Sequence, residues 1–158
     1  MAIDLLHFQK TIEMTKPIAW LIDTNVISEM MKPHPEQRVV GLLDSIGDGL
    51  GLSSFPVWEI LNQIGKMDSG KRRDEKADRF QTILDVLFED RIIDWSVTHA
   101  LECAKIMKEK RRIGEALDDH LPGAFLVAVA KCHDLSLITR NTRDFRNTGV
   151  VTLNPWQD

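Results

Sequence analysis

The sequence has few cysteines, no long apolar run and no excess of positive charge, and each absence excludes a class of protein. With two cysteines in 158 residues, Cys103 and Cys132, the chain lacks the disulfide framework of a small secreted domain. The longest apolar run, residues 124–130, is far shorter than the ~20 residues of a membrane-spanning helix. The N-terminus also lacks the apolar core and cleavage site of a secretory signal. We therefore expect a cytoplasmic protein with reduced cysteines and no membrane partner.

The charge balance leaves nucleic-acid binding open. The net charge is -4, and 43% of the residues are hydrophobic, which is ordinary for one globular domain of this length. An acidic chain can still act on nucleic acid, because carboxylates that bind cations add negative charge that the cations offset. Basic clusters at residues 71–73 and 108–112 could contact phosphates, although such runs more often form solvated helix faces. None of the five histidines has the spacing of a zinc ligand.

Strand and helix patterns alternate along the chain. Such alternation predicts an α/β fold of three layers, in which helices cover both faces of a central parallel sheet of four to five strands. The helix at 122–133 is apolar almost all round and should be the buried one. Elsewhere one apolar face should be buried, including Leu61 in the second helix and Val97 and Leu101 in the fourth. The predicted strands are 19–23, 51–54, 91–95, 136–139 and 150–153, and the predicted helices are 36–46, 56–66, 71–88, 96–111 and 122–133.

Residues 1–16 precede the first predicted strand and match none of these elements. We predict that they form an N-terminal extension to a single domain at 17–158. The extension is interpreted as a tag, as translation from an upstream start codon or as read-through from a neighbouring gene. The alternative is a short N-terminal helix carrying Leu5, Leu6, Phe8 and Ile12.

Asp23 is the most informative residue. It ends the apolar run at 18–22, and an acid at the carboxyl end of a buried strand lies where open parallel sheets bind ligands. Its alternative role is the N-cap of the following helix. Glu59 and Asp144 follow later strands, although taken singly they are typical of a solvated surface acid and a turn residue. Phosphodiester hydrolysis with Mg²⁺ or Mn²⁺ requires carboxylates that converge at one edge of the sheet.

Several strings resemble one family. Leu-Ile-Asp-Thr-Asn-Val-Ile-Ser-Glu at 21–29 resembles the opening of PIN domains, small metal-dependent nucleases that include the toxins of VapBC-type toxin–antitoxin pairs. Thr-Arg-Asn-Thr-Arg-Asp-Phe at 139–145 resembles a later motif of the family. Leu-Asp-Asp-His-Leu-Pro at 117–122 and Asn-Pro-Trp at 154–156 resemble one toxin subgroup. The resemblance runs from about Ile18 to Trp156, and it departs at Ser96, where many relatives carry an Asp.

The resemblance implies an endoribonuclease in which Mg²⁺ or Mn²⁺, held by the acids, activates water for attack on an RNA phosphodiester. It also implies a homodimer, a VapB-like antitoxin and contact with operator DNA only through that antitoxin. Asn25 and Ser28 would support the first acid by hydrogen bonds. The resemblance assigns Asp23 and Glu59 as catalytic acids and metal ligands, Asp144 as a further catalytic acid, and Asn141 as a metal ligand.

One acid that the resemblance leads us to expect is missing. Relatives have Leu-Pro-Asp-Ala at the start of the buried helix, whereas this chain has Gly123 in the acid's place. The substitution could be an inactivating one, introduced or selected, or the chain could be a natural relative that has lost catalysis. Alternatively, Asp119 could supply the missing catalytic and metal-binding carboxylate. Asp118 and Asp119 are otherwise typical of helix capping.

Gly123 therefore supports a second hypothesis, an inactive PIN-fold module that binds an antitoxin or RNA. A phosphorylated receiver domain would share the layered architecture. It requires paired acids after the first strand, whereas this chain has the single Asp23.

Overall fold

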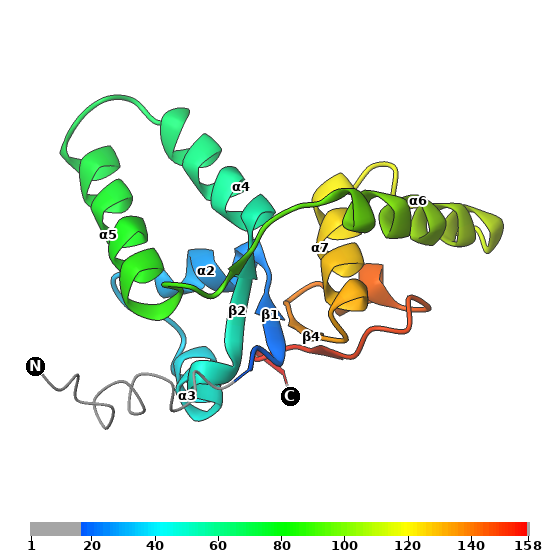
Figure 1. Ribbon diagram of the computed structural model, residues 1–158. Helices are drawn as coiled ribbons and strands as arrows, with labels where there is room; N and C mark the ends of the chain where they lie inside the picture. Colours follow the sequence, from blue (N-terminus) through cyan, green and yellow to red (C-terminus); the bar gives the residue numbers. More distant parts are fainter. Residues whose placement is uncertain (1–16, 158) are drawn as a thin grey trace, which may run out of the picture.

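A central five-stranded sheet organises residues 17–157, which are the residues that the computed structural model describes (Figure 1). The strands lie in the order β3-β2-β1-β4-β5, and every neighbouring pair is parallel. The predicted parallel α/β fold is confirmed. The predicted extension at residues 1–16 lies outside the described residues. The strands are β1 (Trp20–Ile22), β2 (Leu50–Ser53), β3 (Ile92–Ile93), β4 (Ser136–Ile138) and β5 (Thr152–Leu153).

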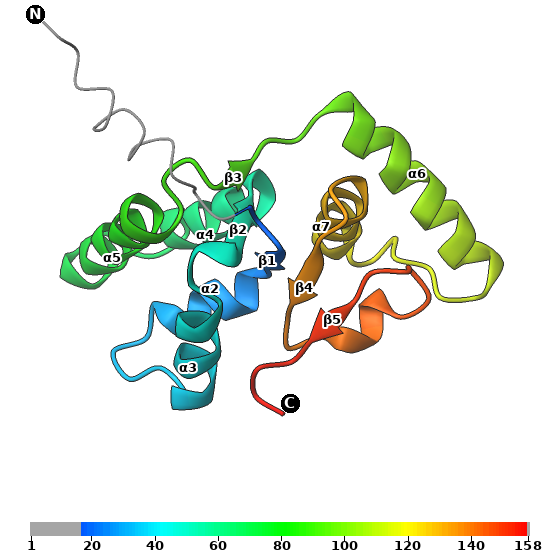
Figure 2. The same cartoon turned by 60° about the horizontal axis from the view of Figure 1, so that its bottom comes forward.

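Helices cover both faces of this sheet, as Figure 2 shows from below. Two short 3-10 helices, η1 (Gly47–Gly49) and η2 (Thr142–Phe145), lie in the connections. Each predicted strand and helix is present, and its ends lie within two residues of the prediction. The helices of one face are α2 (Thr24–Met30), α3 (Gln37–Ile46), α4 (Ser54–Gly65) and α5 (Lys71–Leu87), and those of the other are α6 (Val97–Arg112) and α7 (Leu121–Cys132).

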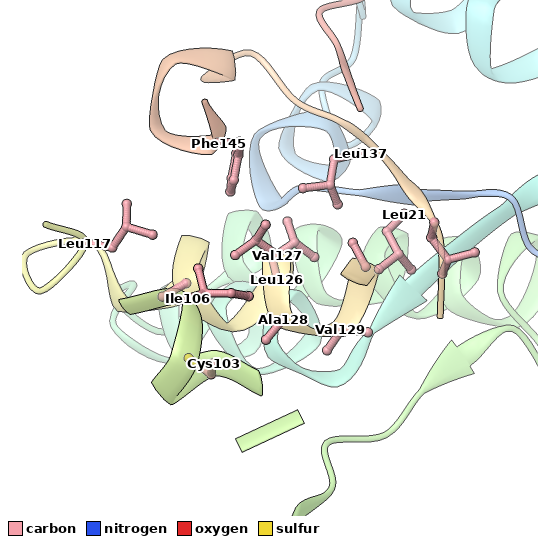
Figure 3. Close-up of a cluster of buried hydrophobic side chains, with 13 residues drawn as sticks. Leu21, Cys103, Ile106, Leu117, Leu126, Val127, Ala128, Val129, Leu137 and Phe145 are labelled. Atoms are coloured by element: carbon pink, nitrogen blue, oxygen red, sulfur yellow. The ribbon is translucent and has the colours of Figure 1, made fainter. Parts of the chain in front are cut away.

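Alternate strand residues build the two halves of the core. Leu21 of β1 and Leu137 of β4 pack in one cluster with residues of α6 and α7 (Figure 3), whereas Ile22 and Ile138 pack against α2 to α5. Successive side chains of a strand point to opposite faces, so an unbroken apolar run supplies both clusters. α7 buries seven of its twelve residues, as its continuous apolar sequence predicts.

The predicted apolar faces are wrong in two helices. In α4, Leu61 is 52% exposed, and in α6 Val97 and Leu101 are 76% and 62% exposed. α6 instead buries a face that includes an imidazole and an ammonium group. Both polar groups have hydrogen-bond partners, so apolar periodicity could not reveal this face. The residues that α6 buries are His99, Cys103, Ile106 and Lys110.

Both cysteines carry free thiols. Cys103 lies in the core, and burial raises the pKa of its thiol. Among residues 17–157, no helix combines the length and the apolar character needed to cross a membrane.

A candidate acidic site at the carboxyl edge of the sheet

Asp23 lies at the carboxyl end of β1 and also caps the helix that follows. Its backbone N–H donates to the carbonyl oxygen of Ile138 at 3.0 Å, which holds it beside the end of β4. Its Oδ1 accepts a hydrogen bond from the N–H of Thr24 at 2.7 Å, at the start of α2. The two roles considered for Asp23 are therefore compatible, because each carboxylate oxygen has its own environment.

The second oxygen of Asp23, Oδ2, is held by side chains from two segments. The hydroxyl of Thr139, directly after β4, donates to it at 2.7 Å, and Nδ2 of Asn25 donates at 3.0 Å. The Thr139 hydroxyl also accepts from the N–H of Asn141 at 3.0 Å. The N–H of Arg140 donates to Oδ1 of Asn25 at 3.1 Å, which fixes the amide with its Nδ2 toward Asp23. The carboxylate is thus oriented by fixed donors on two of its sides.

Glu59 comes to the same place from the neighbouring strand. It lies in α4, which begins directly after β2, and its Oε2 accepts a hydrogen bond from the hydroxyl of Thr24. Thr24 therefore bridges the two acids, since its N–H binds Asp23 and its hydroxyl binds Glu59. Thr24 and Thr139 were not among the predicted site residues, and their only sequence signal is a hydroxyl residue beside each strand end.

Asp144 joins this site indirectly. It lies in η2, where its Oδ2 accepts a hydrogen bond from Nδ2 of Asn141. Asn141 in turn reaches Asp23 through the hydroxyl of Thr139. Nε2 of His120 lies 3.6 Å from the same Asp144 oxygen. The network therefore runs from β1 through the end of β4 to η2 and the start of α7.

Gly123 leaves a space that His120 fills. Gly123 is the third residue of α7 and is buried. A Cβ atom at this position would lie 2.4 Å from Cδ2 and 2.8 Å from Nε2 of His120, far inside contact distance. The imidazole thus occupies the place where an acidic side chain at position 123 would begin. A histidine three residues before the glycine was the available sequence signal, and it was missed.

Three of the predicted residues have side chains that lie outside this network in the described part of the chain. Asp118 pairs with Arg111, whose Nη2 lies 2.5 Å from its Oδ1, and this hydrogen bond lowers the pKa of Asp118. Asp119 is exposed in the turn before α7, so a role for it as replacement acid stays a prediction. Ser28 is half-buried on α2.

Glu29, the last residue of the first motif, is buried beside the site. Its carboxylate accepts from Nζ of Lys32 at 2.6 Å and from the N–H of Glu36 at 2.9 Å. The hydrogen bond from Lys32 is the main reason that the pKa of Glu29 is lowered. The guanidinium of Arg140 lies 3.8 Å from Glu29 and stacks on Trp156 at 4.0 Å from the ring centre. The Asn-Pro-Trp segment thus braces the loop that fixes Asn25.

The donor chemistry fits a hard divalent cation. Carboxylate and amide oxygens are the ligands that Mg²⁺ and Mn²⁺ prefer, and Mg²⁺ commonly binds through one or two carboxylates while it keeps several waters. Among residues 17–157, no three His, Cys, Asp or Glu side chains lie close enough to hold an ion by themselves. Asp23 and Glu59 could therefore hold a cation as a pair, with solvent completing its coordination.

The structure is thus a three-layer α/β domain whose acids gather where the parallel strands end, the edge at which open α/β sheets bind ligands. The chain belongs to the PIN domain family, whose model matches residues 20–151. Among curated proteins it is similar to Toxin FitB of Neisseria gonorrhoeae, with 33% identity over 87% of this chain and 99% of that protein. It is also similar to VapC ribonuclease Y4jK of Sinorhizobium fredii, with 27% identity over 87% of this chain and 97% of that protein.

Solved structures agree with this assignment. The crystal structure of FitAcB from Neisseria gonorrhoeae matches with a TM-score of 0.80 and 33% identity, over 88% of this chain and 99% of that one. A structure of FitAB bound to a DNA fragment matches with the same TM-score and 31% identity, over 88% and 96% of the two chains. The chain is thus related to the toxins of toxin–antitoxin systems.

Proposed function

We propose that this protein is a toxin-type endoribonuclease that hydrolyses RNA phosphodiesters with Mg²⁺ or Mn²⁺, and that Gly123 reduces its activity. The observation that carries the proposal is the bridge through Thr24, which holds the carboxylates of Asp23 and Glu59 at one edge of the sheet. The name of the relative Y4jK, a VapC ribonuclease, supports RNA as the substrate class.

Asp23 and Glu59 would hold the cation, and the carbonyl oxygen of Asn141 could add a neutral ligand. The bound cation would polarise the phosphodiester and supply hydroxide near neutral pH. Thr24 and Thr139 hold the two carboxylates in place before a cation arrives, which limits the ordering needed on binding. Asp144 lies at the far end of this network, where its carboxylate could accept a proton.

Gly123 reduces the expected affinity for the cation. It supplies no carboxylate, and the imidazole of His120 fills the space instead. Fewer negative charges at the site mean weaker attraction for a divalent ion. This same observation supports the alternative, a PIN-fold module that retains antitoxin or RNA binding but does not hydrolyse RNA.

The similarity to FitAcB and to FitAB bound to DNA supports the proposed partners. We infer a VapB-like antitoxin that covers the acidic site, and contact with operator DNA only through that antitoxin. We also infer a homodimer that acts in the cytoplasm. Size-exclusion chromatography with light scattering, on the toxin alone and with its antitoxin, tests both assemblies.

Cleavage of total RNA in Mn²⁺ tests the activity. Little or no cutting is expected from the unmodified chain, and Gly123→Asp should restore cutting. Because an aspartate at 123 must displace His120, the pair His120→Ala with Gly123→Asp should cut at least as fast. Asp23→Asn in the Gly123→Asp background is the matched control and should be inactive. Inert Gly123→Asp proteins on every RNA tried would refute the nuclease proposal.

Calorimetric titration with Mn²⁺ separates the proposal from its alternative. Sub-millimolar binding by the unmodified chain, lost in Asp23→Asn, would contradict the pure binding module. Strong cutting by the unmodified chain would instead indicate a third carboxylate from elsewhere, and Asp119→Asn would be the next variant to assay.

A further inference from the structure

A polar hollow of about 320 Å³ lies beside Asp144, outside the pair of acids described above. One wall is the end of α6 and the loop that follows it, with Lys110 and Glu115. The opposite wall is η2 and its end, with Arg143 and Arg146. Asp144 lines the hollow and also belongs to the hydrogen-bond network of the acidic site, so the two sites are contiguous.

The walls of the hollow are anchored in the core. Leu117 follows the α6 loop and is 4% exposed, and Phe145 in η2 is 2% exposed. Both pack in the cluster of Figure 3, where they lie above α7. The side chain of Lys110 is 3% exposed, and its Nζ donates to Glu115 at 2.5 Å and to the carbonyl oxygen of Arg146 at 2.9 Å. This buried ammonium group ties the two walls together.

Two cations at this hollow have exposed guanidinium groups, and the charge of one of them, Arg146, also helps to lower the pKa of the Glu115 carboxyl. Lys110 is paired with Glu115, and the hydrogen bond from Lys110 lowers the pKa of the Glu115 carboxyl. Arg143 and Arg146 are exposed, and neither side chain forms a hydrogen bond or ion pair with the part of the chain that the structure describes. Guanidinium groups present donors in a planar fork that matches phosphate oxygens. A hollow with two exposed guanidinium groups on one wall is therefore suited to an anion.

We propose that the hollow between Lys110 and η2 binds a backbone phosphate of the RNA, next to the phosphodiester at the acidic site. This inference rests on the proposed function, because it takes RNA as the substrate. The chain has a net charge of -4, and Asp23 and Glu59 add negative charge where the RNA must approach. Attraction must then come from cations beside the acids; Arg143 lies in η2 with Asp144, and Arg146 directly follows that helix.

An acidic peptide is the competing ligand, since carboxylates also bind arginine. The phosphodiester strand is favoured because the hollow shares Asp144 with the acidic site, so a strand that enters one passes the other. An acidic peptide carries no phosphodiester for the acidic site to act on, so the proposed function gives it no reason to extend from the hollow to that site. The two ligands are separated by using both as probes.

The test measures binding of a fluorescent single-stranded RNA oligonucleotide to the full chain in EDTA, where no hydrolysis occurs. The variant carries Arg143→Gln and Arg146→Gln, which remove two exposed charges and leave Lys110 with its partners. Affinity should fall roughly tenfold at low salt, and the slope of log affinity against log salt should become shallower by about 0.7, the value for one lost phosphate contact on a single strand. Circular dichroism checks that the variant is folded.

A second basic hollow provides the matched control. Lys66 and Arg72 are exposed at the turn between α4 and α5, on the opposite side of the molecule (Figures 1 and 2). The pair Lys66→Gln and Arg72→Gln removes the same charge and should leave affinity and salt slope within about twofold of the unmodified chain. An equal loss in both variants would overturn the proposal, because it would indicate general electrostatic attraction.

The remaining outcomes also decide the matter. Unchanged RNA binding by the Arg143 and Arg146 variant, or no RNA binding by the chain in EDTA, would overturn the proposal. If a glutamate-rich peptide binds the unmodified chain and loses affinity for the Arg143 and Arg146 variant in parallel with RNA, the hollow would be assigned to acidic peptides. If Gly123→Asp protein cuts RNA while the arginine variant binds RNA normally, the hollow is refuted and the nuclease proposal stands.

Discussion

The packing of His120 on Gly123 makes a quantitative prediction about stability. Alanine at a helical position is normally favoured over glycine by about 1 kcal/mol. At position 123, however, the new Cβ would lie 2.4 Å from Cδ2 of His120, about 1 Å inside ordinary contact distance. We therefore expect Gly123→Ala not to stabilise the protein unless His120 is also removed.

The magnitude follows from two opposing effects. Overpacking of this kind costs about 1–3 kcal/mol, although the imidazole can escape in part because its side chain is 43% exposed. Gly123→Ala alone should then range from neutral to about 2 kcal/mol destabilising. In the His120→Ala background the clash is absent, and the same change should stabilise the protein by about 1 kcal/mol. The coupling between the two positions is thus on the order of 1–3 kcal/mol.

Urea unfolding of the four proteins of this double-mutant cycle measures the coupling. Each protein should keep the same dependence of unfolding free energy on urea, so that midpoints can be compared. If Gly123→Ala stabilises the chain by about 1 kcal/mol in both backgrounds, then His120 does not fill the space beside Gly123. In that case the packing explanation for the missing acid would be refuted.

Three further predictions concern groups near or behind the site. Glu29→Gln should lower the free energy of unfolding at pH 7 by about 1–3 kcal/mol, since Lys32 loses its charged partner. The pKa of Glu29 is lowered in the folded protein, so the difference in unfolding free energy between the unmodified chain and Glu29→Gln should disappear as the pH falls below 4.5. Urea unfolding over this pH range measures the difference, and a constant value would contradict the prediction. Burial lowers the pKa of His99, so the free energy of unfolding should be independent of this group above pH 6.5 and decline below that pH. Thermal unfolding of His99→Gln should show a weaker decline. Thr139→Val should cost about 1–3 kcal/mol by removing the buried donor to Asp23, and chemical unfolding that shows no loss would mean that this hydrogen bond contributes little.

Strand ends and helix limits were predictable because they follow from local patterns. The runs that end at Ile22 and at Ile138 each carry their own apolar signal, and parallel order brings their ends to one edge. The sequence also indicated which acids follow the strands. The hydrogen bonds that join these acids could not be predicted, because no sequence pattern marks a hydroxyl residue such as Thr24 as a bridge between two acids.

Two features required three-dimensional information. The buried face of α6 includes Lys110, whose burial depends on a partner in the loop after the helix and on a carbonyl oxygen of Arg146, 36 residues later. The relation of His120 to Gly123 depends on a side-chain rotation at the start of α7, which spacing alone does not determine. Both are cases in which a polar group is positioned by contacts that hydrophobic periodicity does not describe.

The place of β1 in the sheet has a consequence for synthesis of the chain. β1 lies between β2 and β4, and the hydrogen bond from Thr139 to Asp23 joins residues that are 116 positions apart. A ribosome adds roughly 5–20 residues per second, so Asp23 leaves it on the order of ten seconds before Thr139 follows. Throughout that interval the carboxylate lacks the Thr139 hydroxyl, which is one of the donors that orient it. A nascent chain therefore has no assembled acidic site. The start of synthesis is separated in time from the point at which this site can bind a ligand.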